Sequence, residues 1–560
     1  MKKLLLKIFS KEFTNLNQAA LLLGVFTLLS QILALIRDRS LAHFIGPGAT
    51  LDTYYAAFRV PDLIFISIAS LASITVLIPF IVAKMNGEEV TKEAKKFLND
   101  IFTVFFIALT LVALVAFFLM PHLVFFIAPG FSHAMQMQVV WMSRIMLLSP
   151  IFMGLSNLFG TVTQLFRKFF IFSLSPVFYN LGIIFGVIVL YPFFGIYGLA
   201  MGVAFGALMH MLIQMTASLI CGLTPKFSFS VDFKDIKKAV LISFPRTLGL
   251  AMNSIALIVI IALASFLKSG SISIFNFSYN LQTVPLNIIG VSYAVAAFPS
   301  MARSFTSGKI DEFKKHLKMA ARQIIFWSIP ITFLFIVLRA QIVRVLLGSG
   351  AFSWEDTRLA AAALAIFSFS ILAQSMIGLL SRSYYAGGKT TRPLTVNAIC
   401  SVFIMILSPI LIHIFNVCPY FRYFIESLLK VTDIPGTAIL MLPLAYSIGT
   451  ILNFVLHWVF VKKDFLKNEQ FIAKSFFQSL GASFFIGLVA YLSLNVLSPL
   501  LDTTTFFGVF FQGFISGILG ILAGVLVLYL LKNEELRDLI KALKNKFWRA
   551  KVIVPAQEEL

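Results

Sequence analysis

The sequence predicts an all-α polytopic membrane protein with about fourteen transmembrane helices. Hydrophobic residues make up 59% of its 560 residues and charged residues only 12%, and the mean hydropathy is +0.93. A water-soluble protein is about 25% charged, and its surface cannot absorb such an apolar excess. The apolar stretches are also continuous, without the alternation of a transmembrane β-strand. Soluble enzymes, disordered chains, disulfide scaffolds and β-barrels are therefore excluded.

The individual spans follow from apolar runs of about 20 or more residues, the length needed to cross the hydrocarbon core as a helix. The predicted spans are 15–44, 50–84, 99–127, 138–165, 170–192, 195–222, 238–267, 271–301, 319–346, 357–386, 393–416, 437–461, 472–496 and 505–531. The first follows a lysine-rich start that resembles the beginning of a signal peptide. Its apolar run is too long for one and no small-residue cleavage site follows, so we expect a retained helix.

The distribution of positive charge sets the expected orientation. Of the 45 Lys and Arg residues, 34 fall in or at the edges of the N-terminal tail, alternate loops and the C-terminal tail, while six fall on the opposite side and five within spans. Basic residues accumulate on the cytoplasmic side of membrane proteins. The bias therefore predicts an even number of spans with both termini in the cytoplasm. It also accounts for the net charge of +21 without a nucleic-acid partner.

Two basic amphipathic segments, 226–238 and 303–322, precede the seventh and ninth predicted spans. Their similar placement is a weak sign of two related halves, as in transporters built from parallel repeats. The tail 532–560 has charges at helical spacing, which predicts an interfacial or solvated helix.

Sequence motifs for catalysis and cofactor binding do not stand out. There is no phosphate-binding loop of the GxxxxGK[ST] type and no HExxH zinc motif. The three cysteines are scattered and odd in number, so they form neither a metal-ligand pattern nor a disulfide framework. We expect no cofactor and no enzymatic activity, and any transport would be passive, ion-coupled or driven by voltage.

Charged residues inside the first two spans are the main candidates for a functional site. A charge at mid-bilayer costs about 3 kcal/mol, so such groups face a cavity or a partner. Arg37 and Asp38 lie deep in the first span, and Asp52, Arg59 and Asp62 form one stripe of the second. For Arg37 we favour a cavity role. For Arg59 a cavity role and a helix-locking ion pair with Asp62 are about equally supported, and for Asp62 the pair is favoured.

Two further spans carry polar stripes. Arg246 and Asn253 share one face of the seventh span, where Arg246 is as consistent with an anchor at the membrane surface as with a ligand. The eighth span places Asn276, Asn280 and Thr283 on one face, which fits either interhelical hydrogen bonds or a wall that faces a sugar or peptide. Because arginine binds phosphate bidentately, this set suits an anionic amphiphile with a lipid chain.

Several stretches together resemble the MurJ/MviN family, the lipid II flippases of the MOP exporter superfamily. The main match is LLSQILALIRDRSLAHFIGPGATLDTYYAAFRVPDLI at 28–64, with Ser-x6-Arg-Asp, Gly-x-Gly and Ala-Phe-Arg-x-Pro elements in family order. Further landmarks follow in collinear order up to about residue 400. They are APGF at 128–131, Ser175-Pro176 with Asn180, ASFLKSGSISIF at 264–275, Pro285 with Gly290, FPS at 298–300, YYA at 384–386 with Lys389-Thr390, and Arg392-Pro393.

The resemblance implies a fold and a substrate. It implies an N-terminal lobe over 1–225, a C-terminal lobe over 226–465, a groove for the lipid tail from the spans in 466–531, and a basic cytoplasmic tail at 532–560. The substrate would be lipid II, an undecaprenyl pyrophosphate that carries a disaccharide-pentapeptide, moved across the bacterial cytoplasmic membrane for cell-wall synthesis. Membrane lipids would be the other partners, and a coupling ion is left open.

The resemblance also implies the site residues. Arg37 matches the family's cavity arginine, Asp38 follows it as in the family, Asp52 matches the acidic residue that starts helix 2, and Arg59 stands at a basic position. The sequence departs from the family elsewhere: Gln31, Phe65, Ile66, Asn280 and Thr283 stand where charged residues occur. Asn280 aligns with a cavity arginine of helix 8, and Arg246 is the candidate to compensate for it.

Three alternatives remain open from the sequence. The first is a flippase of another polyprenyl-pyrophosphate-linked oligosaccharide, which the missing charges would fit. The second is a cation-coupled drug exporter of the same superfamily, which needs a cavity rich in carboxylates. The third is a membrane-embedded transferase, which needs a catalytic His or Asp pair at a membrane face; none stands out.

Overall fold

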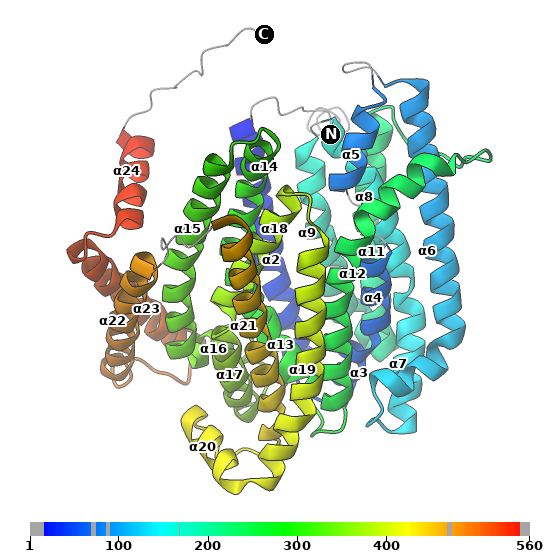
Figure 1. The fold of residues 1–560 in the computed structure, drawn as a ribbon. Helices are drawn as coiled ribbons and strands as arrows, with labels where there is room; N and C mark the ends of the chain where they lie inside the picture. Colours follow the sequence, from blue (N-terminus) through cyan, green and yellow to red (C-terminus); the bar gives the residue numbers. More distant parts are fainter. Residues whose placement is uncertain (1–15, 69–73, 86–89, 167, 467–472, 549–560) are drawn as a thin grey trace. The chain divides into compact units, whose positions relative to one another are not determined.

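The fold is helical throughout the part of the chain that the structure describes (Figure 1). The computed structural model describes residues 16–68, 74–85, 90–166, 168–466 and 473–548, and no strand occurs in these ranges. A backbone in lipid must satisfy its own hydrogen bonds, which the α-helix does within one segment. The predicted all-α class is therefore confirmed.

Eleven helices among the described residues are long and apolar enough to cross a membrane, and a bent pair raises the number to twelve. The eleven are Lys92–Ile127, His133–Leu165, Phe170–Phe194, Ile196–Ile220, Thr247–Ala264, Ser271–Thr306, Ile310–Val337, Thr391–Val417, Thr437–Leu466, Ala473–Leu497 and Phe506–Leu530. The bent pair is α17 (Trp354–Ser368) with α18 (Ile371–Ala386), which meet at 43°. These twelve correspond to the third to fourteenth predicted spans.

The first two predicted spans are not among these twelve. The first coincides with α2 (Leu16–Phe44), a helix of 29 residues. The second, 50–84, is divided into α3 (Ala49–Ala57), α4 (Arg59–Ser67) and α5 (Ile74–Val82), and residues 69–73 within it lie outside the described part. The total of fourteen therefore stays a prediction.

The break between α3 and α4 at Phe58 is explained by Pro61. Proline has no amide hydrogen, so the carbonyl of Ala57, four residues earlier, loses its helical partner. The Ser143 hydroxyl of α7 (His133–Met146) donates to this carbonyl at 3.0 Å. The kink that Pro61 predicts is thus stabilised by a side chain, as expected in a membrane interior.

A second kind of irregularity is the π-helical turn, which the sequence did not predict. One such turn, η3 (Leu286–Val291), follows Pro285 at the end of α13 (Ser271–Pro285) and leads into α14 (Ser292–Thr306). Others are η2 (Gly186–Leu190) and η5 (Lys462–Leu466). Such turns often occur near functional sites.

Glycines allow two helices of the N-terminal part to approach closely. α9 (Phe169–Phe185) and η2 carry Gly182 and Gly186, and α11 (Ile196–Ile220) carries Gly198, Gly202 and Gly206, all at four-residue spacing. A Cβ added to Gly202 would lie 2.5 Å from the Gly186 Cα. Small residues at this spacing are the usual way for membrane helices to make backbone contact.

The chain divides into two compact units that differ from the predicted lobes. The first contains residues up to Val284 together with Leu346–Phe367 and Lys389–Asn453; the second contains Pro285–Val345, Ser368–Gly388 and Phe454–Leu560. α12 (Phe233–Ala264) joins the first unit because it packs on α4, α5 and α6 (Lys92–Ile127) as well as on α19 (Thr391–Val417). The lobes 1–225 and 226–465 and the tail groove 466–531 stay predictions.

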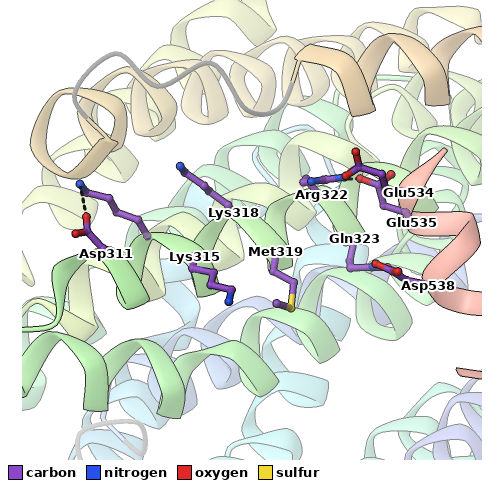
Figure 2. A pocket seen from close by; sticks show the side chains of 10 residues that line it. Asp311, Lys315, Lys318, Met319, Arg322, Gln323, Glu534, Glu535 and Asp538 are labelled. Atoms are coloured by element: carbon purple, nitrogen blue, oxygen red, sulfur yellow. Dashed lines mark hydrogen bonds and ion pairs between the residues drawn. The ribbon is translucent and has the colours of Figure 1, made fainter. Parts of the chain in front are cut away.

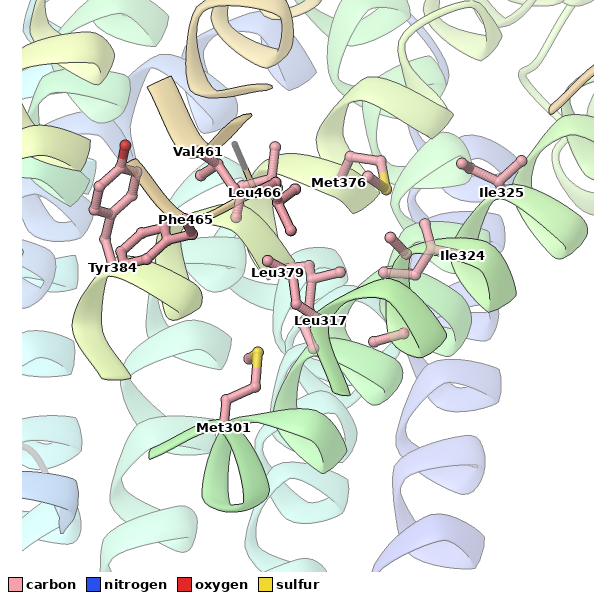
Figure 3. Close-up of a cluster of buried hydrophobic side chains, with 14 of the residues drawn as sticks. Met301, Leu317, Ile324, Ile325, Met376, Leu379, Tyr384, Val461, Phe465 and Leu466 are labelled. Carbon is pink, nitrogen blue, oxygen red and sulfur yellow. The ribbon is translucent and has the colours of Figure 1, made fainter. Parts of the chain in front are cut away.

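The second unit has its own apolar core (Figure 3). Buried side chains of α14, α15 (Ile310–Val337), α18 and the end of α21 (Met441–Val461) meet there, among them Met301, Leu317, Leu379 and Val461. Phe465 and Tyr384 pack ring against ring at its edge, with centroids 5.2 Å apart. α15 is one continuous helix from Ile310, so the predicted amphipathic segment at 303–322 supplies its first turns.

The predicted C-terminal tail begins as a docked helix. α24 (Glu534–Trp548) follows α23 (Phe506–Leu530), and its first-turn carboxylates Glu534 and Glu535 accept from Arg322 of α15 at 2.5 and 2.6 Å. Figure 2 shows this contact beside a cleft of about 420 Å³. The first turn of the tail is therefore held by ion pairs rather than fully solvated; residues 549–560 lie outside the described part.

Candidate functional site

A polar cavity of about 260 Å³ lies within the first unit, at the helices that the sequence singled out. It is lined by Arg37, Asp38, Leu41, Tyr54, Tyr55, Phe58, Arg59, Asp62, Tyr179, Ile183, Leu257, Asn276, Tyr279 and Asn280. These residues come from α2, α3, α4, α9, α12 and α13. Of the six predicted site residues, the structure thus brings four together: Arg37, Asp38, Arg59 and Asn280.

Arg37 and Asp38 are adjacent in the chain and form an ion pair at the cavity wall. The Arg37 Nε and Nη2 both donate to Asp38 Oδ1, at 2.9 and 2.8 Å, and the Arg37 Nη1 donates to Asn180 Oδ1 at 3.3 Å. The Arg37 side chain is 21% exposed and the Asp38 side chain 4%. The guanidinium therefore reaches the cavity while the carboxylate is buried behind it.

Amide side chains hold this pair from both sides. Asn180 of α9 also donates to the Ser30 hydroxyl at 3.3 Å, which fixes it against α2. On the other side, Asn280 of α13 donates to Asp38 Oδ2 at 3.0 Å. The result is a chain of contacts Asn180–Arg37–Asp38–Asn280 that joins three helices, and each amide leaves the charges of the pair unchanged.

Arg59 lines the cavity from α4, and its hydrogen-bond partner is not the Asp62 that the sequence analysis considered. Its Nη2 donates to Asn276 Oδ1 at 2.5 Å, and no ion pair between Arg59 and Asp62 occurs among the described residues. The Asp62 side chain is instead exposed at the cavity. The Arg59–Asp62 helix lock is thus wrong: an amide of the eighth predicted span takes the position of the carboxylate.

Two polar atoms of the site are buried and have no partner in the described structure. They are the Nε of Arg59 and the hydroxyl of Tyr55. A buried donor without a partner costs about 1–3 kcal/mol, so native proteins rarely retain one without a reason. Both atoms belong to residues that line the cavity.

Asp52 belongs to α3 and does not line the cavity; its carboxylate contacts the start of α13. Its Oδ2 accepts from the backbone NH of Gly270 at 2.7 Å, and its Oδ1 accepts from the NH and hydroxyl of Ser273 at 2.8 and 2.6 Å. It is 2% exposed. A carboxylate at a helix N-terminus satisfies orphan NH groups, so this geometry gives Asp52 a role in placing α13 rather than in touching substrate.

Arg246, the sixth predicted site residue, lies in α12, but its side chain is not part of the described structure. The sequence analysis did not single out three tyrosines that line the cavity, Tyr54, Tyr179 and Tyr279. Tyr179 and Tyr279 are next in sequence to Asn180 and Asn280, which the sequence analysis named, and Tyr54 lies two residues after Asp52. A tyrosine close to each of these polar positions is the sequence signal that could have identified the three cavity tyrosines.

The cavity carries two arginines and two aspartates, so it is formally neutral rather than biased toward positive charge. Its walls are otherwise mostly aromatic and aliphatic. Arginine can bind phosphate with two parallel hydrogen bonds, and Arg37 can do so if Asp38 releases it. Among the described residues no group of three or more His, Cys, Asp or Glu side chains could hold a metal ion.

Comparison with known proteins assigns this architecture to a family. Residues 41–511 match the family described as Lipid II flippase MurJ. The chain belongs to the MurJ family. The probable lipid II flippase MurJ of Rickettsia prowazekii is 27% identical over 392 residues, 68% of this chain and 76% of the relative. The relative from Aquifex aeolicus is 27% identical over 402 residues, 70% and 76% of the two chains.

Solved structures agree with this MurJ-family fold. A lipid II flippase MurJ in an inward closed conformation superposes with a TM-score of 0.72 at 22% identity, covering 93% of this chain and all of that one. An inward-facing multidrug resistance MATE transporter of the MOP superfamily gives 0.61 at 12% identity, over 79% of this chain and 96% of that one. The family and the apolar helices make the protein an integral membrane protein.

Proposed function

We propose that this protein is a flippase that moves lipid II across the bacterial cytoplasmic membrane by alternating access, and that it is not an enzyme. Membership of the MurJ family supports the substrate class. The observation that carries the mechanism is the Arg37–Asp38 pair at the wall of the cavity. An anion that enters the cavity competes with Asp38 for the guanidinium.

The size of the cavity indicates which part of lipid II it holds. Ligand pockets for drug-sized molecules are about 300–1,000 Å³, whereas this cavity is about 260 Å³. It has room for the pyrophosphate but not for a disaccharide-pentapeptide as well. The larger headgroup therefore requires a more open state, and movement between such states is the core of alternating access.

Arg37 and Arg59 are the residues we expect to bind the pyrophosphate. Arg37 exchanges Asp38 for a phosphate oxygen, and Arg59 contributes a guanidinium whose Nε has no partner in the described structure. The Tyr55 hydroxyl is a third donor. Asp38 keeps its hydrogen bond from Asn280 during this exchange, so the displaced carboxylate is not left without a partner.

The charges of the loops and of the substrate bear on the orientation of the protein in the membrane and on the energy source for transport. The basic bias of the loops favours an orientation with both termini in the cytoplasm. The membrane potential can supply about 2.3 kcal/mol per charge per 100 mV, which suits transport of an anion outward. The carboxylate of Asp62, exposed at the cavity, is the group that a coupling cation would meet.

A flippase of another polyprenyl-pyrophosphate-linked oligosaccharide is the second candidate. It is favoured by Asn280, since an amide stands where the family resemblance implies an arginine. Such a substrate shares the pyrophosphate and differs in the sugar, so Arg37 and Arg59 would act in the same way.

Complementation separates the two. In a bacterium depleted of its own lipid II flippase, the wild-type chain is expected to restore growth and the exposure of lipid II outside, while Arg37→Ala at equal membrane level does not. Growth failure of the wild-type chain at a normal membrane level would contradict lipid II as substrate and favour the second candidate.

A further inference from the structure

The short helix α20 (Pro419–Leu429) exposes an aromatic face that no part of the described chain covers. Tyr420 is 89% exposed, Tyr423 69%, Phe424 60% and Leu428 62%. Their spacing of three, one and four residues places them on one side of a helix. Ser427 is the one polar residue on this side. Four large apolar residues on one exposed face mark a surface that meets a partner or a membrane.

The opposite side of α20 is firmly attached to the first unit. Ile425 and Leu429 are each 9% exposed and Glu426 is 6% exposed. The Glu426 carboxylate accepts from the Thr437 hydroxyl at 2.5 Å and from Arg422 Nε at 2.9 Å. The exposed face is thus held in a fixed direction rather than presented by a loose loop.

The position of α20 in the chain places this face at the membrane surface. Only Cys418 separates α20 from α19, a helix that is long and apolar enough to span the membrane and ends at Val417. Cys418 has an extended backbone and Pro419 opens the new helix, so α20 does not continue α19. Figure 1 shows α20 running across the end of α19.

The exposed face of α20 also continues the apolar stripe of α19. Large aliphatic side chains of α19 are exposed at helical spacing from Ile399 to its end: Ile399, Val402, Ile406, Ile410, Ile414 and Val417. In a spanning helix such a stripe faces lipid. The stripe ends in aliphatic residues and is followed at once by Tyr420, Tyr423 and Phe424. Tyrosine is one of the two aromatic residues that gather at the level of lipid headgroups.

We propose that α20 is an interfacial helix whose Tyr420–Tyr423–Phe424–Leu428 face is inserted into the headgroup region of the bilayer at the end of α19. An amphipathic helix of this kind lies in the plane of the interface with its apolar face about 5–10 Å deep. The occupant of the face is lipid. The charge bias of the loops puts it in the outer leaflet, but the insertion itself does not depend on orientation.

The test measures the depth of a fluorophore on the full-length protein in liposomes. Cys221, Cys400 and Cys418 are replaced by alanine, and an environment-sensitive dye is attached at Tyr423→Cys or Leu428→Cys. Glu355→Cys is the matched control, because Glu355 is exposed at the start of α17 in the same unit. Quenching is recorded with lipids spin-labelled near the headgroup, with lipids labelled deep in the acyl chain, and with aqueous iodide.

Both labels on α20 are expected to emit at shorter wavelength than the control, to lose fluorescence most strongly to the headgroup-proximal spin label, and to be protected from iodide. Two positions guard against a single disruptive substitution. If both labels are quenched by iodide as fully as the Glu355 control and spared by both lipids, lipid does not cover the face. A soluble protein partner would then be the better assignment.

Discussion

The Asn280 side chain donates a hydrogen bond of 3.0 Å to Asp38 Oδ2, and so connects α13 to the ion pair of α2. At this position an amide supports the Asp38 carboxylate without adding a charge to the cavity. An arginine there would compete with Arg37 for the same carboxylate. The amide instead leaves Asp38 available to neutralise Arg37.

The first prediction concerns this contact. Asn280→Asp would place a second carboxylate about 3 Å from Asp38, where like charges are strongly unfavourable, and we expect it to abolish transport. Asn280→Ala removes the donor without adding charge and should lower transport only in part. Lipid II exposure is measured for both at matched membrane levels. Equal, full activity of both variants would show that Asn280 does not support the Asp38 carboxylate.

The second prediction separates Asp52 from the substrate site. Asp52→Ala removes the acceptor for Gly270 and Ser273 at the start of α13, and should lower the free energy of unfolding by about 1–2 kcal/mol, as other helix caps do. The thermal midpoint of the purified protein reports this loss. Asp311→Ala is the matched control: Asp311 is exposed on the first turn of α15 and makes only a surface ion pair with Lys314, so its loss should change the midpoint little. Transport per folded Asp52→Ala molecule should stay near normal; its complete loss would return Asp52 to the substrate site.

The third prediction addresses the glycine contact between α9 and α11. Gly202→Leu would force the two backbones apart, because even a Cβ meets the Gly186 Cα at 2.5 Å. Overpacking of this kind costs about 1–3 kcal/mol or more. Size-exclusion profiles and the thermal midpoint should show a destabilised protein. Gly481→Ala, where a Cβ meets nothing within 4 Å, should behave as wild type. A wild-type midpoint for Gly202→Leu would contradict this packing.

The fourth prediction is a pH dependence at the C-terminal helix. Hydrogen bonding from Arg322 holds the pKa of Glu534 below its usual value. A lowered carboxylate pKa stabilises the docked state above the ordinary pKa of glutamate, and this stabilisation is lost as pH falls through the lower pKa of the folded protein. Since Glu534 is 42% exposed, the effect should be modest.

A spin label at Lys541→Cys reports docking of α24. Its mobility should rise as the pH is lowered through the pKa of Glu534, and Arg322→Gln should give the mobile spectrum already at neutral pH. Lys315→Gln, which removes an exposed positive charge of the same cleft without touching Glu534, is the control. A label whose mobility is the same in Arg322→Gln and in the control would show that these ion pairs do not hold α24.

The helical class and the twelve later spans could be predicted from the sequence. So could the common cavity of Arg37, Asp38, Arg59 and Asn280, because charged and polar side chains in apolar helices face a cavity or a partner rather than lipid. The sequence could not predict that the Arg59 guanidinium would donate its hydrogen bond to Asn276 rather than to Asp62. Helical spacing places Arg59 and Asp62 on one face, but a neighbouring helix decides which acceptor is nearer. The role of Asp52 could not be predicted for a similar reason. Its position in the helical stripe is the same whether its carboxylate caps a neighbouring helix or contacts a ligand.

The central claim is that Arg37 exchanges Asp38 for the pyrophosphate of the substrate. The direct measurement is translocation of lipid II by purified protein in proteoliposomes under a membrane potential, comparing wild type, Arg37→Ala, Arg37→Lys and Asp38→Asn at equal reconstitution. We expect no transport by Arg37→Ala and weak transport by Arg37→Lys, which keeps the charge but loses the bidentate geometry. Asp38→Asn should bind the substrate more tightly and release it more slowly. Wild-type rates for a well-folded Arg37→Ala protein would contradict the account.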